Sequence, residues 1–230
     1  MDLLSVAANR RTFNAGTDDL SRHTQRKWYI AERDLGHRVE FQEMDMAAGE
    51  HKEPKFLSVN PFGALPAMTV TDDEGRELYH LFESGALLLA LAEIVQETNT
   101  TAKRAVASQW VLFANSTLGN ALFVESIREK QLPGVLSTLD TLLQTREYLN
   151  GDAFSVCDVA VGAYLLYVPL FFPNLSFAEY PAVCAYMCRL RERAAYQATL
   201  GARIAGASAS APPPSRMPAG GDDQAAGTTA

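Results

Sequence analysis

Residues 60–66 read Asn-Pro-Phe-Gly-Ala-Leu-Pro (NPFGALP), a stretch whose prolines and glycine restrict the backbone to a turn. Two apolar runs follow, residues 67–70 and 78–82, and the polar sequence TDDEG at 71–75 joins them. Apolar runs joined in this way are typical of a β-hairpin. The strongly apolar stretch from residue 83 to residue 95 then predicts a helix.

The segment before this turn predicts the rest of a small α/β unit. Residues 20–35 have helical spacing, with acidic residues before them as N-caps and Gly36 as a stop signal. Residues 39–46 (VEFQEMDM) alternate apolar and polar side chains, as a half-buried strand does. Residues 12–15 form a short candidate strand before the helix. The resulting order, β-α-β, turn, β-β-α, predicts a small mixed sheet with helices on its faces.

Strand signals stop after residue 99. Helical spacing continues in four segments, at residues 101–123, 127–145, 156–172 and 181–200. The sequence from residue 205 consists of Ala, Gly, Ser and Pro with little to bury, so we expect disorder there. We therefore expect three parts: residues 10–97, residues 101–203 and a tail at 205–230.

Ser155 and Asp158 have the spacing of a capping box just before a long apolar run. We interpret Asp158 as a structural helix cap that contributes about 1 kcal/mol to stability.

Composition and charge exclude several function classes. The 230 residues are 47% hydrophobic and 20% charged, which is ordinary globular usage. The formal charge of −7 argues against nucleic-acid binding, which normally needs a basic face. The longest apolar stretch, residues 159–172, is shorter than the roughly 20 residues that cross a membrane, so we expect no membrane span. The apolar run at residues 3–8 is too short for a signal peptide.

The three cysteines, Cys157, Cys184 and Cys188, are an odd and low number for a disulfide framework. This usage predicts a reducing compartment, which we take to be the cytoplasm. Cys184 and Cys188 can share a helix face, but without nearby His or further Cys we read them as plain thiols and expect no metal site.

Several motifs in combination resemble the cytosolic glutathione S-transferases. They are GEHK at 49–52, NPFGALP at 60–66, LFESGA at 81–86, YLxGDxFSVxD at 148–158 and the Tyr-Pro that opens the last helix at 180–181. The resemblance covers roughly residues 18–200. Ser21-Arg22, seven residues before Trp28, is closest to the serine-type classes of bacteria, cyanobacteria and plants, including phi-like enzymes.

The resemblance implies an α/β thioredoxin-like N-terminal domain that binds glutathione and an all-α C-terminal helical domain that holds an electrophile. Glutathione is then a co-substrate and no cofactor is expected. The implied reaction is conjugation of the glutathione thiolate to small hydrophobic electrophiles, and reduction of a peroxide stays open. Because no cysteine precedes Cys157, mixed-disulfide chemistry is disfavoured. The resemblance also implies a homodimer.

A free thiol has a pKa of about 8.5, so an enzyme that uses glutathione as a nucleophile has to stabilise the thiolate. A hydroxyl donor at a helix N-terminus serves this purpose. Ser21, near the start of the first predicted helix, is our catalytic candidate, and Thr17 is the fallback. Each of them could equally be a helix cap.

The resemblance assigns the remaining glutathione contacts by position. Leu65 is expected to present its backbone to the cysteine of the peptide, before a cis peptide bond to Pro66. Ser84 and the N–H groups of the helix that it begins would bind the γ-glutamyl carboxylate. Glu83 would accept from the γ-glutamyl ammonium. His51 and Lys52 would pair with the glycine carboxylate, although exposed loop residues of these types are often only solvated.

Aromatic and apolar residues of the helical part are candidates for the electrophile pocket, or simply for the core. They are Trp110, Phe113, Asn115, Leu118, Phe123, Tyr164 and Tyr167. The alternative to an enzyme is a non-catalytic interaction or scaffold module with the same fold. Such modules are usually fused to another folded domain, whereas a short low-complexity stretch follows here.

Overall fold

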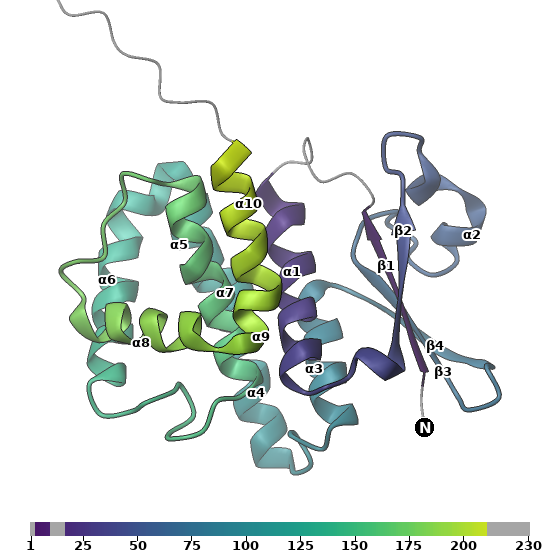
Figure 1. Cartoon of the computed structure of the whole chain (residues 1–230), viewed down its shortest axis with the longest axis horizontal. Coiled ribbons are helices and arrows are strands. Elements are labelled where there is room, and N and C mark those ends of the chain that lie inside the picture. Colours follow the sequence, from purple (N-terminus) through teal and green to yellow (C-terminus); the bar gives the residue numbers. More distant parts are fainter. Residues whose placement is uncertain (1–2, 10–16, 211–230) are drawn as a thin grey trace, which may run out of the picture.

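A computed structural model of the protein describes residues 3–9 and 17–210, with side chains described from Thr24 to Gly206. Figure 1 shows a small sheet on one side and a bundle of helices on the other, with helices α1 and α3 between them. The α/β part and the all-α part are the two domains that the sequence predicts.

The sheet is built from β1 Leu3–Asn9, β2 Val39–Met44, β3 Ala67–Thr71 and β4 Glu77–Phe82. Within the described residues these four strands have the order β2-β1-β3-β4. The pair β1–β2 is parallel, and the pairs β1–β3 and β3–β4 are antiparallel. Met68 and Val70 of β3 belong to the core, while Thr69 points to the other face. There Thr69 and Phe56 line a cavity of about 210 Å³.

The helices of this domain are α1 Thr17–Glu32, η1 Gly36–Arg38, η2 Glu50–Lys52, α2 Pro54–Leu57 and α3 Ser84–Ile94. Helices α1 and α3 lie on the face of the sheet toward the helical domain, and α2 lies on the far side (Figure 1). The predicted helices at 20–35 and 83–95 and the strands at 39–46, 67–70 and 78–82 are therefore present, with small shifts at their ends.

The first strand differs from the prediction. We expected it at residues 12–15, which lie outside the described residues. The sheet instead takes β1 from Leu3–Asn9, ahead of the boundary that we placed at residue 10. Strand β1 lies in the interior of the sheet, between β2 and β3. Its sequence, LLSVAAN, does not alternate strictly between apolar and polar residues, so the period of two that identifies a half-buried strand is missing.

The helical domain begins with α4 Thr101–Phe113, the π-helical turn η3 Ala114–Leu118 and α5 Gly119–Phe123. It continues with α6 Glu125–Leu143, α7 Val156–Phe171, α8 Pro181–Glu192, α9 Ala194–Tyr196, η4 Gln197–Gly201 and α10 Ala202–Ser210. Helix α7 is the centre of the domain, because all of its residues from Val156 to Val168 are buried. An all-round apolar helix of this kind is a core helix.

The C-terminal segment also differs from the prediction. Disorder was expected from residue 205, yet α10 continues to Ser210. Alanine has the highest helix propensity, and Ile204 packs against the core, so this part of the segment has both a local and a tertiary reason to be helical. Residues 211–230 lie outside the described residues.

Helix α1 joins the two domains. Trp28 is fully buried, with its ring centroid 5.8 Å from that of Phe154 and 5.4 Å from that of Tyr196. The Trp28 indole N–H donates to Glu32 at 2.9 Å, and Arg193 donates to both oxygens of Glu32 at 2.7 and 2.8 Å. The first domain is thus built into the core of the second.

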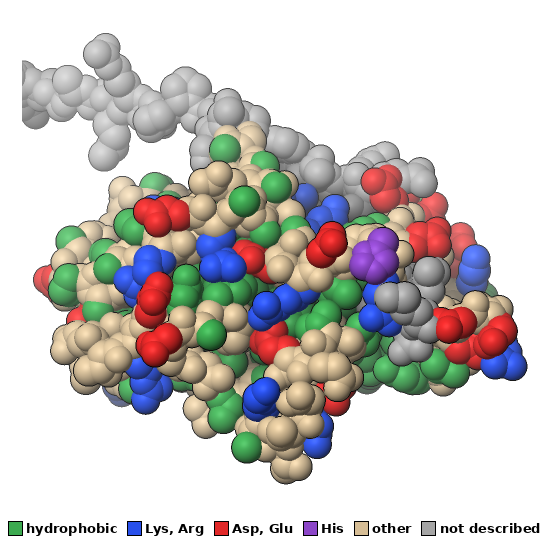
Figure 2. Space-filling model, turned by 60° about the horizontal axis from the view of Figure 1, so that its bottom comes forward, with side chains coloured by type: hydrophobic (Ala, Val, Ile, Leu, Met, Phe, Trp, Pro, Cys, Tyr) green, Lys and Arg blue, Asp and Glu red, His purple; other side chains and the backbone are tan. Residues whose placement is uncertain are grey.

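Acidic and basic side chains are interspersed over the face of the molecule that Figure 2 displays. Within the described part of the chain, no helix is long and apolar enough to cross a bilayer. The described His, Cys, Asp and Glu residues also form no group of three or more that could hold a metal ion. Cys188 is exposed and Cys184 half-buried, whereas burial raises the pKa of the Cys157 thiol to about 12.

Candidate functional site

The strand register brings the predicted binding segments to one end of the sheet. Asn9 pairs with Met44, Ala7 with Ala67, and Ala67 with Phe82. The carboxyl ends of β1, β2 and β4 therefore lie beside the amino end of β3. The chain enters α1, η2 and α3 after those carboxyl ends, and the turn at 60–66 leads into β3. All the glutathione contacts expected from the sequence belong to these four segments.

The turn at residues 60–66 is held by Asn60, whose side chain is buried. Its amide donates to Ala64 O at 2.6 Å and accepts from Phe62 N at 3.1 Å. The peptide bond between Leu65 and Pro66 is cis, as expected. The turn thus delivers the Leu65 backbone to the end of the sheet, directly before β3.

The segment with His51 and Lys52 packs against this turn. The Lys52 ammonium donates to the carbonyl of Gly63 at 2.9 Å and to that of Phe62 at 3.3 Å. Gly63 has a φ of +57°, and a Cβ there would lie 2.7 Å from Lys52 Nζ and 2.9 Å from His51 O, so only glycine fits. His51 Nδ1 is buried and has no hydrogen-bond partner among the described residues. Lys52 has three donors, so one is left for a ligand, and His51 offers a second group.

Glu83 and Ser84 form the start of α3. Glu83 has a φ of 73°, which is uncommon for a residue with a side chain and marks a constrained turn. The Glu83 side chain is exposed and makes no capping hydrogen bond with the helix. Ser84 is 1% exposed. The first N–H groups of a helix have no partner within it, so this end suits an anion.

The catalytic candidates belong to α1, where the structure describes their backbone only. Thr17 is the first residue of α1 and Ser21 is the fifth. Their side chains lie outside the described residues. Only the first four N–H groups of a helix are left without an intrahelical acceptor, so Thr17 lies at the end where the helix dipole acts most strongly. Ser21 lies one turn further in, and both remain candidates.

The candidate residues for the electrophile pocket do not all lie in one place. Trp110 and Phe113 line an apolar groove of about 600 Å³ between α4 and α6, together with Val135, Leu139 and Leu142. Leu118 is fully buried in the core.

The other candidates meet near the end of α7. Phe123 lies against Tyr164, with ring centroids 6.1 Å apart, and against Phe171 at 5.8 Å. Tyr167 stacks on Phe171 at 5.7 Å. The Tyr164 hydroxyl donates to the Asn115 side chain at 3.1 Å.

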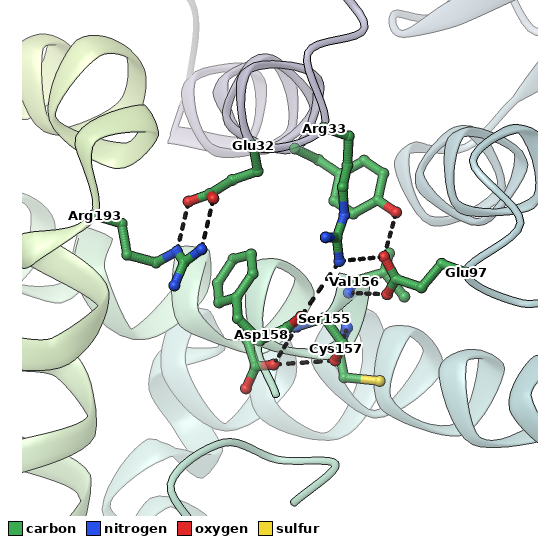
Figure 3. A network of polar contacts seen from close by, with 10 residues as sticks. Glu32, Arg33, Glu97, Ser155, Val156, Cys157, Asp158 and Arg193 are labelled. Carbon is green, nitrogen blue, oxygen red and sulfur yellow. Dashed lines mark hydrogen bonds and ion pairs between the residues drawn. The ribbon is translucent and has the colours of Figure 1, made fainter. Parts of the chain in front are cut away.

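Sequence reasoning missed a polar network at the domain junction, which Figure 3 shows. The Glu97 carboxylate accepts from the Tyr29 hydroxyl at 2.6 Å, from Arg33 at 2.5 Å and from Val156 N at 2.6 Å. Burial, with Glu97 beside it, raises the pKa of Tyr29. Glu97 contacts residues far from its own segment and therefore carries no local signal, so it could not be found from spacing.

The capping box was predicted and is confirmed, because Ser155 and Asp158 make both of its hydrogen bonds.

Two family models match the chain. The model for the N-terminal domain of glutathione S-transferases matches residues 19–93, and the model for the C-terminal domain matches residues 124–194. The chain belongs to the glutathione S-transferase family. The N-terminal match begins at residue 19, so it includes Ser21 but neither Thr17 nor β1.

Individual proteins are also similar to this chain in sequence or in structure. Glutathione S-transferase F9 of Arabidopsis thaliana is 29% identical over 65% of this chain and 74% of its own length. Elongation factor 1-gamma-A of Xenopus laevis is 31% identical over 51% of this chain, which corresponds to 29% of that protein. The crystal structure of glutathione transferase URE2P8 from Phanerochaete chrysosporium, with oxidized glutathione, has a TM-score of 0.69 at 19% identity, over 90% of this chain and 98% of that one. The glutathione transferase fold therefore extends through both domains.

Proposed function

We propose that this protein is a glutathione transferase that conjugates the glutathione thiolate to small hydrophobic electrophiles. The observation that carries the proposal is the meeting of four segments at one end of the sheet: the start of α1, η2, the turn before β3 and the start of α3. Together they offer a hydroxyl, a basic pair, the Leu65 backbone before β3 and a helix N-terminus. This set fits a small peptide with a thiol and two carboxylates.

Each part of glutathione has a matching group in the proposal. The N-terminus of α3 at Ser84 binds the γ-glutamyl carboxylate, and Glu83 accepts from the ammonium. The Leu65 backbone, before cis-Pro66, pairs with the cysteine as an added strand would. His51 and the remaining donor of Lys52 bind the glycine carboxylate. Glutathione acts as a co-substrate, and the electrophile binds on the side of the helical domain.

The thiolate is stabilised by a hydroxyl of α1, Ser21 in our primary assignment and Thr17 in the alternative. Each pKa unit by which the thiol is lowered corresponds to about 1.4 kcal/mol. One charge-assisted hydrogen bond contributes about 1.5–3 kcal/mol, so one hydroxyl suffices for a shift of one to two units. We further propose a cytoplasmic location and a serine-type mechanism.

The test is conjugation of glutathione to a chlorodinitrobenzene by the purified protein. We expect Ser21→Ala to lower kcat by about 10- to 100-fold, as the loss of one charge-assisted hydrogen bond does. Retention on a glutathione affinity column should persist. Thr17→Ala is measured in parallel, and Ser137→Ala on the exposed side of α6 is the matched control. A loss in Thr17→Ala alone would transfer the role to Thr17, and full activity in both variants would refute a hydroxyl donor. A peroxide assay with the same variants tests whether the thiolate also reduces peroxides.

The alternative is a non-catalytic interaction or scaffold module. It is favoured by the similarity to elongation factor 1-gamma-A over 51% of this chain. A protein of this kind would show neither conjugation nor peroxide reduction. Loss of retention on the glutathione column as well would exclude the proposed ligand.

We also propose that the protein forms a homodimer in which the first domain of each protomer packs on the second domain of its partner. Phe62, at the tip of the turn, is 72% exposed, and its ring lies edge-on to Phe82. The groove between α4 and α6 is apolar and has room for an aromatic side chain. Phe62 and the groove belong to different domains. In a two-fold dimer each protomer can place its Phe62 in the groove of its partner, so the same contact forms twice.

Phe62→Lys is expected to shift the protein from dimer to monomer in sedimentation velocity at micromolar concentration, because a charge would have to be buried in an apolar groove. Val135→Lys, which alters the groove instead, should have the same effect. Leu112→Lys is the control: Leu112 is 64% exposed on α4 but does not line the groove. Dimers that persist in both Phe62→Lys and Val135→Lys would contradict this interface.

A further inference from the structure

The helix that begins as α4 is interrupted by the π-helical turn η3 Ala114–Leu118 before it resumes as α5. At this turn the Ser116 hydroxyl donates to Leu112 O at 2.6 Å. A π-turn adds a residue to the helix, re-aims the side chains around it and is frequent at functional sites. Asn115 is the half-buried polar residue of this turn.

Asn115 bridges the two domains. Tyr164 of α7, 5% exposed, donates its hydroxyl to Asn115 Oδ1 at 3.1 Å. This bond leaves the amide nitrogen facing α3, where a Cβ on Gly85 would lie 2.7 Å from Nδ2. The same Cβ would lie 2.7 Å from Val111 Cγ1. Gly85 is therefore the residue that lets the π-turn approach the first turn of α3.

The open donor of Asn115 is the second part of the argument. Within the described residues, Asn115 Nδ2 makes no hydrogen bond, while Oδ1 is occupied by Tyr164. Asn115 is half-buried, and Nδ2 is not one of the fully buried side-chain atoms that lack a partner, so this donor keeps access to solvent and to a bound ligand. The amide lies beside the residue after Ser84, at the helix end where the proposed function places the γ-glutamyl carboxylate.

We propose that Asn115 is a positioning residue for glutathione. Its amide, oriented by Tyr164, sets the place of the first turn of α3 relative to the helical domain and adds an uncharged donor beside the γ-glutamyl carboxylate. Tyr164 also contacts Phe123, which packs on Phe171, so the pair of Asn115 and Tyr164 links this end of glutathione to the aromatic residues of the helical domain. The inference rests on the proposed function and extends it to a residue outside the glutathione-binding domain.

The experiment compares the wild type with Asn115→Asp and Tyr164→Phe, by isothermal titration with glutathione and by steady-state kinetics with chlorodinitrobenzene. Asn115→Asp keeps the shape of the side chain but places a negative charge beside the bound carboxylate. We expect it to raise both the Kd and the KM for glutathione at least tenfold, with kcat within threefold of wild type and Tm unchanged or higher. The increase should shrink as salt is added, because the repulsion is electrostatic. Tyr164→Phe should raise KM about two- to fivefold.

Asn120→Asp, an exposed site on α5 with the same change of net charge, is the matched control and should bind glutathione as the wild type does. A Kd of Asn115→Asp within twofold of wild type would overturn the role of Asn115 alone. A parallel fall of Tm and kcat with no change in KM would also overturn it, because it would show a purely structural residue. If Asn115→Asp does not fold, Tyr164→Phe decides, and an unchanged KM there refutes the inference. Absence of glutathione binding in the wild type would instead refute the proposed function itself.

Discussion

Asp158→Ala is expected to lower the free energy of unfolding by about 3–5 kcal/mol. Asp158 is 0% exposed, and its carboxylate accepts four hydrogen bonds. The donors are Leu149 N at 2.9 Å, Ser155 N at 2.8 Å, Ser155 Oγ at 3.0 Å and the Tyr186 hydroxyl at 3.0 Å. Alanine would leave all four donors buried without an acceptor. The expected loss exceeds the roughly 1 kcal/mol of an ordinary N-cap because two of the donors, Leu149 N and the Tyr186 hydroxyl, come from other segments.

The measurement is urea unfolding, followed by tryptophan fluorescence and by circular dichroism. Asp158→Asn keeps one acceptor oxygen and removes the buried charge, so we expect a smaller loss, of about 1–2 kcal/mol. Asp152→Ala, an exposed aspartate in the same loop, is the control and should stay within about 0.5 kcal/mol of wild type. A loss below about 1 kcal/mol in Asp158→Ala would show that the carboxylate is only a local cap.

Features that depend on neighbouring residues could be predicted from the sequence. The alternation of VEFQEM gave β2, the spacing of Ser155 and Asp158 gave the capping box, and NPFGALP gave the cis bond before Pro66 through its resemblance to a family. In each case the residues that cause the structure lie within one short segment. The resemblance assigned the residues of the candidate site by position. Three of its four segments adjoin β2, β3 and β4, whose patterns predicted them, whereas α1 follows β1, which its pattern did not predict.

Features that depend on distant partners could not be predicted. The sequence of β1 does not alternate strictly, and its place between β2 and β3 depends on pairing with strands that are distant along the chain. The role of Glu97 depends on α1 and on the start of α7, 59 residues away. The approach of Asn115 to Gly85 depends on a π-turn that helical spacing does not reveal. In these cases the burial of a residue and the residues it contacts depend on tertiary packing, which patterns along the sequence do not predict.

Glu97→Ala is expected to lower the free energy of unfolding by about 2–4 kcal/mol and to weaken the coupling between the domains. Glu97 lies between α3 and α4, and its carboxylate joins Tyr29 and Arg33 of the first domain to the backbone of Val156 in the second. Its side chain is 17% exposed and that of Arg33 29%, so the ion pair is partly shielded from solvent. The variant would leave the buried Tyr29 hydroxyl, the guanidinium and the first N–H of α7 without this acceptor.

Tyr29 and Arg33 belong to the first domain and Val156 belongs to the second. Removing their shared acceptor should therefore lower the cooperativity of unfolding as well as the stability. We expect the fluorescence and circular dichroism transitions of Glu97→Ala in urea to separate, whereas those of the wild type coincide. Glu97→Gln, which keeps an acceptor but not the charge, should lose about half as much. Glu74→Ala removes an exposed ion pair with Arg76, whose side chains are 66% and 74% exposed, and should cost no more than about 0.5 kcal/mol. If Glu97→Ala lost no more than this surface control, the domains would be held together by the packing around Trp28 alone, and the carboxylate would have no part in their coupling.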